Sequence, residues 1–257
     1  MRKSTFALWF AAAFLLAGTA FAQRAPVRRV LVTTIRPDRI GDFEAAVKQY
    51  VEAYAKVPGV GSVAVMQSLT GTRHYLQIRD AARWSDLDPN PVSKALAANL
   101  DLVRINERIR GCVEGSTMLV EELLPELSTT TTPSEPPTMI RMARSRIRSD
   151  KTAEFEAIVR NELLPGSLKA GVKSFSVRRV RFGGPTTDYY ISTRVDSWAD
   201  ATADKLSKAM GAEAYRAMVA KLTAITTSRD INLYRFRQDL SYHAPTVASS
   251  ATSAAAH

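Results

Sequence analysis

Two short segments carry the same set of side chains that could bind an anion. "YLQIR" (75–79) and "YISTR" (190–194) both read Tyr-x-(Gln/Ser)-x-Arg. Successive side chains of a β-strand point to opposite faces, so the three polar residues of each segment share one face. A guanidinium pairs with a carboxylate through two parallel hydrogen bonds. The pattern therefore predicts a cavity for a small ligand that is anionic or carries a carboxylate.

Five residues are candidates for contact with that ligand. Leu76 and Ile78 are expected to pack on helices. Ile191 and Thr193 are expected to do the same, which turns the polar side chains of both strands toward a shared interior. The helix-facing position expected for Val177 turns the next arginine inward. The predicted ligand-binding residues are Tyr75, Arg79, Arg178, Tyr190 and Arg194. The alternative is that these arginines lie at sheet rims in solvent or form ion pairs between the halves.

Other residues with reactive or aromatic side chains receive structural interpretations. His74 is expected to be a polar surface residue, with a ligand or base role as the alternative. Trp84 and Trp198 follow matching strands and are expected to be packing anchors at strand-to-helix corners. Arg144 and Arg146 share one strand face, which the sequence does not identify as inner or outer. Acidic residues in the first turns of two helices are expected to complement the helix dipole, namely Asp38, Glu44, Asp150 and Glu156.

The candidate segments belong to an internal repeat. "RPDRIGDFEAAV" (36–47) and "RSDKTAEFEAIV" (148–159) are identical at six of twelve positions, 112 residues apart. "YLQIRDAARW" (75–84) aligns with "YISTRVDSW" (190–198), with an offset of 115 at the tyrosines and 114 at the tryptophans. Small insertions in turns account for these shifts. A repeat of this length predicts two copies of one structural unit.

Each copy has the same predicted order of elements, which is strand, helix, two strands, helix, strand. The expected strands are 27–36, 61–68, 74–80 and 116–123 in the first copy, and 139–148, 174–182, 188–195 and 231–237 in the second. The expected helices are 38–57 and 92–108, then 151–169 and 199–228. Period-two and helical apolar spacing support these assignments.

The βαββαβ order predicts an α+β fold of two tandem ferredoxin-like domains. Each domain has an antiparallel sheet with helices on one face, so its other face needs a partner. The two sheets are expected to pack together as an internal pseudo-dimeric α/β barrel. The predicted domains are 27–124 and 138–242, joined by a Pro/Thr-rich linker at 125–137 and followed by a disordered tail at 243–257.

The first 22 residues are typical of a secretory signal peptide. Arg2 and Lys3 precede an apolar run (6–16), and "AFA" (20–22) is a small-x-small cleavage site. The protein is therefore expected to be exported, to the periplasm or beyond, without stable membrane insertion after cleavage. An uncleaved anchor is the alternative. Cys112 is the only cysteine, so an intramolecular disulfide is impossible.

The segments "DRIGDFEAAV" (38–47) and "DKTAEFEAIV" (150–159), together with the element order, resemble the dimeric α/β-barrel superfamily. That superfamily includes domains of the antibiotic-biosynthesis-monooxygenase, NIPSNAP and EthD kinds. The resemblance covers about 27–242 and implies a tandem fusion. Some relatives ligate haem through a histidine, and others are cofactor-independent monooxygenases. No catalytic set of theirs matches this chain residue by residue.

Three functions stay open. The first is binding of a small anionic or aromatic ligand in the barrel, and the second is a cofactor-independent monooxygenase or isomerase. The third is RNA binding, favoured by the +10 net charge and the βαββαβ order. The sequence lacks the RNP pattern, so no nucleic-acid partner is expected. No HExxH, CxxC, P-loop, GxGxxG or GxSxG motif occurs, so neither a metal nor a cofactor is expected. Self-association to a homo-oligomer is left open.

Overall fold

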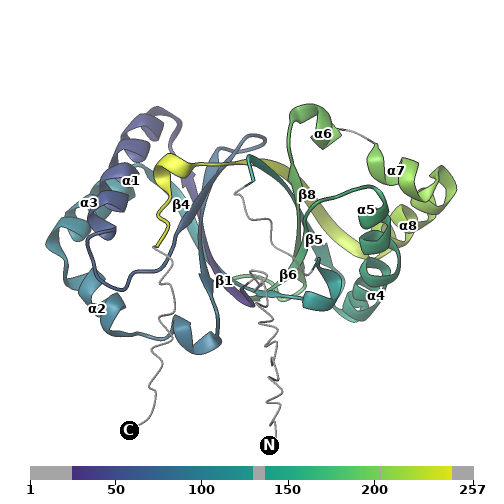
Figure 1. Cartoon of the computed structure of the whole chain (residues 1–257), viewed down its shortest axis with the longest axis horizontal. Helices are drawn as coiled ribbons and strands as arrows, with labels where there is room; N and C mark the ends of the chain where they lie inside the picture. Colours follow the sequence, from purple (N-terminus) through teal and green to yellow (C-terminus); the bar gives the residue numbers. More distant parts are fainter. Residues whose placement is uncertain (1–24, 130–136, 203, 245–257) are drawn as a thin grey trace, which may run out of the picture.

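Segments rich in β-branched residues form the strands of a closed barrel. The computed structural model describes residues 25–129, 137–202 and 204–244. Within them, antiparallel strands close in the order β1-β3-β2-β8-β5-β7-β6-β4 (Figure 1). Their bounds are β1 Val27–Ile35, β2 Ala64–Ser68, β3 His74–Ala81, β4 Val113–Leu123, β5 Met139–Ile147, β6 Phe175–Phe182, β7 Asp188–Val195 and β8 Thr226–Phe236. The predicted α+β fold is confirmed at this level.

The helices lie outside the barrel, on two opposite sides of it (Figure 1). α1 forms because its apolar residues recur at helical spacing, and it buries Phe43, Ala46, Val47 and Tyr54 against the sheet. Asn90 caps α2, since its side chain accepts a hydrogen bond from the backbone N–H of Ser93. The bounds are α1 Ile40–Tyr54, α2 Pro91–Ala98, α3 Leu100–Arg110, α4 Thr152–Ile158, α5 Leu164–Lys169, α6 Trp198–Thr202, α7 Lys205–Met210 and α8 Ala212–Ile225.

The same strand pairing occurs in both halves of the chain. β1 lies between β3 and β4, and β2 pairs with β3. β5 lies between β7 and β8, and β6 pairs with β7. Two further pairings, β2 with β8 and β4 with β6, join the halves and close the barrel. Each half therefore contributes four adjacent strands to one continuous wall.

The second half departs from the predicted helices. The helix expected over 151–169 contains a π-helical turn, Val159–Leu163, between α4 and α5. The helix expected over 199–228 is divided into α6, α7 and α8, and β8 begins at Thr226, five residues before the predicted strand. Thr226 and Thr227 are β-branched and extend the ladder along β5, where Thr226 pairs with Ile147.

The two halves exchange short arms that follow their last strands. After β4, Leu127 is buried in the second half's core with Phe155 and Val177. After β8, Leu240 is buried in the first half's core with Phe43 and Tyr75. A helical turn carries each leucine, Pro125–Leu127 and Gln238–Leu240. The halves are thus packed into each other's cores.

A serine fastens each arm in the same way. The hydroxyl of Ser128 accepts from the N–H of Val177 at 2.9 Å, and that of Ser241 accepts from the N–H of Val65 at 2.9 Å. The linker expected at 125–137 therefore begins with ordered residues, and 130–136 lie outside the described residues. The predicted signal peptide and nearly all of the predicted tail also lie outside them. In the described part of the chain, no helix is long and apolar enough to cross a bilayer.

Candidate functional site

The barrel encloses a cavity of about 410 Å³. Small-molecule sites are usually apolar cavities with a few polar groups that fix the orientation of the ligand. The apolar walls here are Val30, Val32, Leu76, Ile78, Leu119 and Met142. The polar groups are Arg28, Thr72, His74, Glu121, Arg144, Tyr190, Asp230, Asn232 and Tyr234. The interior thus has the composition of a binding site.

His74 and Tyr234 form a hydrogen-bonded pair at the cavity. The His74 Nδ1 atom lies 2.7 Å from the carbonyl oxygen of Thr72, and its Nε2 atom lies 2.7 Å from the Tyr234 hydroxyl. A carbonyl only accepts, so Nδ1 carries the proton. In the neutral imidazole, Nε2 therefore accepts from the Tyr234 O–H. Burial raises the pKa of Tyr234, so the phenol stays protonated. The pair can receive a proton from a ligand and hold it.

Tyr190 and Glu121 supply further hydrogen-bonding groups. Burial raises the pKa of Tyr190 to about 12, and the charge of Glu121 adds to that shift. Glu121 is 5% exposed and lines the cavity. Burial also raises the pKa of Glu121, against the opposing attraction of Arg28 and Arg178. Within residues 25–129, 137–202 and 204–244, nothing donates a hydrogen bond to its carboxyl group. A ligand could therefore be its partner.

The raised pKa of Glu121 gives a pH-dependent prediction. Between the unfolded and the folded pKa, the folded chain keeps a proton that the unfolded chain has lost, so stability falls as pH rises through this window. Glu121→Gln has no ionisable group at this position, so the fall in stability with rising pH is removed. We expect the variant to melt at a higher temperature than the native chain at about pH 7 and at nearly the same temperature at about pH 4.

The matched control for this experiment is Glu114→Gln, which changes an exposed carboxylate on the same strand. It is expected to leave the melting temperature nearly unchanged at both pH values. Equal destabilisation by Glu121→Gln at both pH values would mean that the carboxylate has an essential structural partner.

Arginines gather around one carboxylate beside the cavity. Arg144 and Arg146 both donate to Asp188, at distances from 2.6 to 3.2 Å between nitrogen and oxygen. Asp188 is buried, and Arg144 also lines the cavity. This places Arg144 on the inner face, which the sequence left undecided. The two guanidiniums face two carboxylates, Asp188 and Asp230. Asp230 lies opposite Arg144 in the strand register and also lines the cavity, so this part of the wall carries no net charge.

Tyr75 and Arg79 do not line the barrel, so the shared interior predicted for them is wrong. Tyr75 is fully buried on the helix side, with its ring 4.8 Å from Phe43, and it donates to Glu44 at 2.5 Å. Arg79 lies on the same face, 5.2 Å above the ring of Tyr54. Leu76 and Ile78, predicted to pack on helices, instead form the inner wall.

A one-residue error in the repeat alignment explains this correction. Tyr189, not Tyr190, repeats Tyr75, because its ring lies 4.6 Å from Phe155 and its hydroxyl donates to Glu156 at 2.8 Å. The true offset is 114, the same as at the tryptophans. Strand side chains alternate, so a slip of one position moves each of them to the opposite face.

The second-half candidates have three different environments. Tyr190 lies on the barrel interior, as expected, and its contact with a ligand stays a prediction. Val177 packs on the helix side and Val180 on the inner side, so Arg178 faces inward; it is 2% exposed and donates to the carbonyl of Ala25 at 2.8 Å. Arg194 pairs with Asp196 and borders a different cavity, outside the barrel.

His74, Glu121 and Tyr234 are candidate site residues that the sequence interpretation missed. His74 shares strand parity with Leu76 and Ile78, so the correct inward face would have included it. Trp84 and Trp198, expected to be packing anchors, are 40% and 54% exposed, and the ring of Trp84 packs edge-to-face on Phe182. Of the first-turn carboxylates, Glu44 and Glu156 accept hydrogen bonds from buried tyrosines, which the dipole interpretation did not include.

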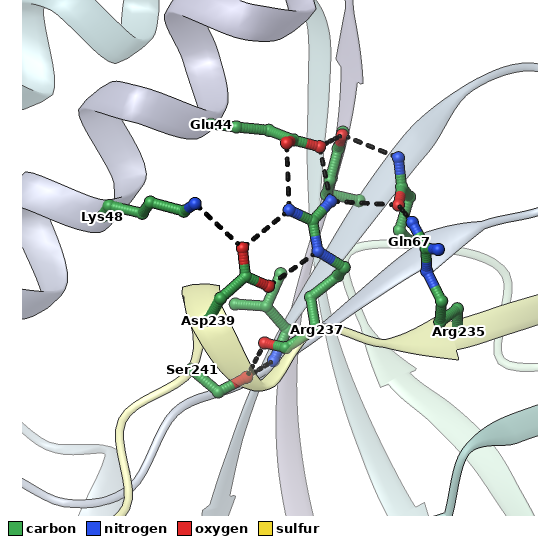
Figure 2. A network of polar contacts seen from close by, with 9 residues as sticks. Glu44, Lys48, Gln67, Arg235, Arg237, Asp239 and Ser241 are labelled. Carbon is green, nitrogen blue, oxygen red and sulfur yellow. Dashed lines mark hydrogen bonds and ion pairs between the residues drawn. The ribbon is translucent and has the colours of Figure 1, made fainter.

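A polar network outside the barrel fixes the C-terminal arm (Figure 2). Arg237 donates to Glu44 of α1, to Gln67 of β2 and to Asp239. Lys48 approaches Asp239 to 3.2 Å. The hydrogen bonds from Arg237 hold the pKa of Glu44 below its usual range. Because these charges satisfy one another away from the cavity, the network is a structural clasp between the halves.

Among the described residues, no group of three or more His, Cys, Asp or Glu side chains could hold a metal ion. No protein-family model and no curated protein matches the chain. Solved structures do resemble it. One, described as a "putative monooxygenase" from Fusobacterium nucleatum, is 10% identical, covers 83% of this chain and 93% of its own, and has a TM-score of 0.54.

Two further structures give similar values. A "putative monooxygenase" from Lactobacillus acidophilus is 10% identical over 86% of this chain and 97% of its own, with a TM-score of 0.54. An "anthrone oxidase-like protein" is 14% identical over 82% of this chain and 91% of its own, with a TM-score of 0.56. At such identities the likeness establishes the fold, an α+β barrel of the kind found in monooxygenase-like proteins.

Proposed function

We propose that the barrel binds a small organic molecule with an apolar body and polar groups. The supporting observation is the apolar cavity bordered by His74, Tyr234, Tyr190 and Glu121. We further propose that the chain is a tandem fusion of two ferredoxin-like domains of the dimeric α/β-barrel superfamily. The repeated strand pairing and the exchanged arms support this. Export through the N-terminal signal peptide is part of the same proposal.

The His74–Tyr234 pair favours one catalytic candidate, a cofactor-independent oxygenase that acts on an acidic C–H bond. Nε2 of His74, or the phenol relaying to it, takes the proton. The resulting carbanion, held by a hydrogen bond from Tyr190, supplies electrons to dioxygen. For anthrone the balance is one anthrone and one O₂ giving one anthraquinone and one water. General base catalysis of this kind contributes about 10²–10⁴-fold.

The test uses anthrone as the probe, with binding measured by fluorescence quenching and turnover by oxygen uptake. We expect His74→Gln and Tyr234→Phe to reduce turnover about 100-fold while binding weakens much less. Tyr50→Phe, a phenol outside the barrel, is the control and is expected to leave both unchanged. Binding without oxygen uptake would leave the barrel as a binding protein. An absence of binding, together with no extra mass in the native mass spectrum of the exported protein, would contradict the proposal.

A further inference from the structure

A second cavity lies outside the barrel, between the sheet of the second half and the helices that cover it. Its volume is about 380 Å³. Outward-facing side chains of β5, β7 and β8 form one wall, and α5, α7 and α8 form the other. Much of the lining is apolar, including Ala143, Phe175, Ile191, Met218 and Leu222. The space is therefore large enough for an organic ligand, and its lining combines apolar and polar side chains.

An irregular helix borders this space. The N–H of Leu164 donates to the carbonyl of Val159, five residues back, which makes the π turn. Pro165 has no N–H to continue the regular pattern. Leu163, the last residue of the π turn, lines the cavity. Such turns widen a helix locally and are frequent at functional sites.

Two arginines bring unsatisfied positive charge to the cavity. Arg141 and Arg229 both line it, together with Tyr215. Burial lowers the pKa of Arg141, and the nearby charge of Arg229 lowers it further. In the part of the chain that the structure describes, neither guanidinium donates a hydrogen bond or joins an ion pair. Two like charges without a carboxylate between them repel, and an anion would remove that repulsion.

Most of the other charged groups of the cavity have partners; among the described side chains, Asp204 lines the cavity without one. Lys173 and Arg194 both pair with Asp196, at 2.7 and 3.3 Å. Lys205 pairs with Asp200. Asp196 and Asp200 are therefore neutralised by their own neighbours, and Arg141 and Arg229 outweigh the remaining carboxylate of Asp204.

In the first half, an aromatic ring lies beside the corresponding pair of arginines. Arg29 corresponds to Arg141, and Arg79 faces it across the ladder. There the guanidinium of Arg79 lies 5.2 Å from the ring of Tyr54, and Tyr54 is buried with Leu102 in an apolar cluster under the helices. The second half has Gly166 at the position that repeats this tyrosine, so no aromatic ring comes from that position.

We propose that this second cavity binds an amphipathic organic anion, with a carboxylate or phosphate head between Arg141 and Arg229 and an apolar body against the sheet. The guanidinium fork suits both heads. The apolar lining requires the organic part, since a bare inorganic anion would leave that surface uncovered. This site is independent of the barrel cavity and of any reaction there.

The experiment is calorimetric titration of the full chain with octanoate, octyl phosphate, octanol and inorganic phosphate. We expect octanoate or octyl phosphate to bind, and the tighter of the two identifies the head group. Arg141→Gln with Arg229→Gln is expected to weaken that binding by about tenfold or more. Arg229→Gln alone changes an exposed residue that can be replaced without loss of the fold, and it is expected to give part of the effect. Arg216→Gln, an exposed arginine on α8 away from the cavity, should have none.

Several results would overturn the proposal. Octanol binding as tightly as octanoate would mean that the charge is not recognised, and inorganic phosphate binding as tightly as octyl phosphate would mean that the apolar body is not. Equal loss in Arg216→Gln would indicate general electrostatics. Loss in Tyr234→Phe would place the ligand in the barrel instead. Melting provides a further check, because the double variant relieves repulsion and should melt no lower than the native chain.

Discussion

Replacing Gly183 by alanine is expected to destabilise the protein by about 4 kcal/mol or more, among the largest effects of any single substitution. Gly183 has φ +82°, and a Cβ atom there would lie 1.8 Å from the carbonyl oxygen of Met118. That oxygen belongs to the backbone of β4, which cannot move without disturbing the β4–β6 seam that closes the barrel. Chemical denaturation followed by circular dichroism measures the loss.

Gly171→Ala is the matched control because it separates backbone conformation from space. Gly171 has φ +74°, close to that of Gly183, but no atom lies within 4 Å of the position where its Cβ would stand. Only the conformational cost of about 1 kcal/mol is expected there. If the two variants lost equal stability, the contact with β4 would have no importance and the seam would be looser than described.

Leu240→Ala is expected to cost about 2–5 kcal/mol, as is Leu127→Ala. Each leucine is fully buried in the core of the half to which it does not belong in sequence. Because the arms are reciprocal, losing either anchor weakens the packing between halves. We expect a single unfolding transition at a lower denaturant concentration, measured by fluorescence and circular dichroism together.

Leu168→Ala serves as the comparison, since that side chain is 53% exposed and should cost no more than about 0.5 kcal/mol. One result would contradict the role given to the arms. If Leu240→Ala changed only hydrogen exchange around Gln238–Leu240 and left global stability intact, the arm would be a detachable strap and the halves would not depend on it.

The sequence was sufficient for the strands and their order because these rest on apolar periodicity and on a repeated helix start. The pair "DFEAAV" and "EFEAIV" places Phe43 and Phe155 at matching buried positions, and both pack on a tyrosine of the adjacent strand. A helix can be recognised from its apolar spacing even when its first or last residue is predicted one position away. The architecture could therefore be predicted without the exact alignment.

The site could not be predicted in the same way, because a strand face depends on parity. The second copy has two adjacent tyrosines, Tyr189 and Tyr190, and the choice between them decides which side chains face the cavity. The repeat alignment paired Tyr75 with Tyr190, the wrong one of the two tyrosines. The burial of Tyr75 against α1, and hence the inward face of His74, depends on contacts between residues distant in sequence. No local pattern reports those contacts.

The lining of the barrel differs between the two halves wherever it is polar. By strand register, His74 corresponds to Asp188, Leu76 to Tyr190, and Glu121 to Tyr234. A barrel closed by two identical chains would offer any guest two equivalent orientations related by a twofold axis. Here the twofold relation holds for the strands but not for these side chains, so the two orientations of a guest would not be equivalent. Such a chamber can distinguish the two ends of a molecule.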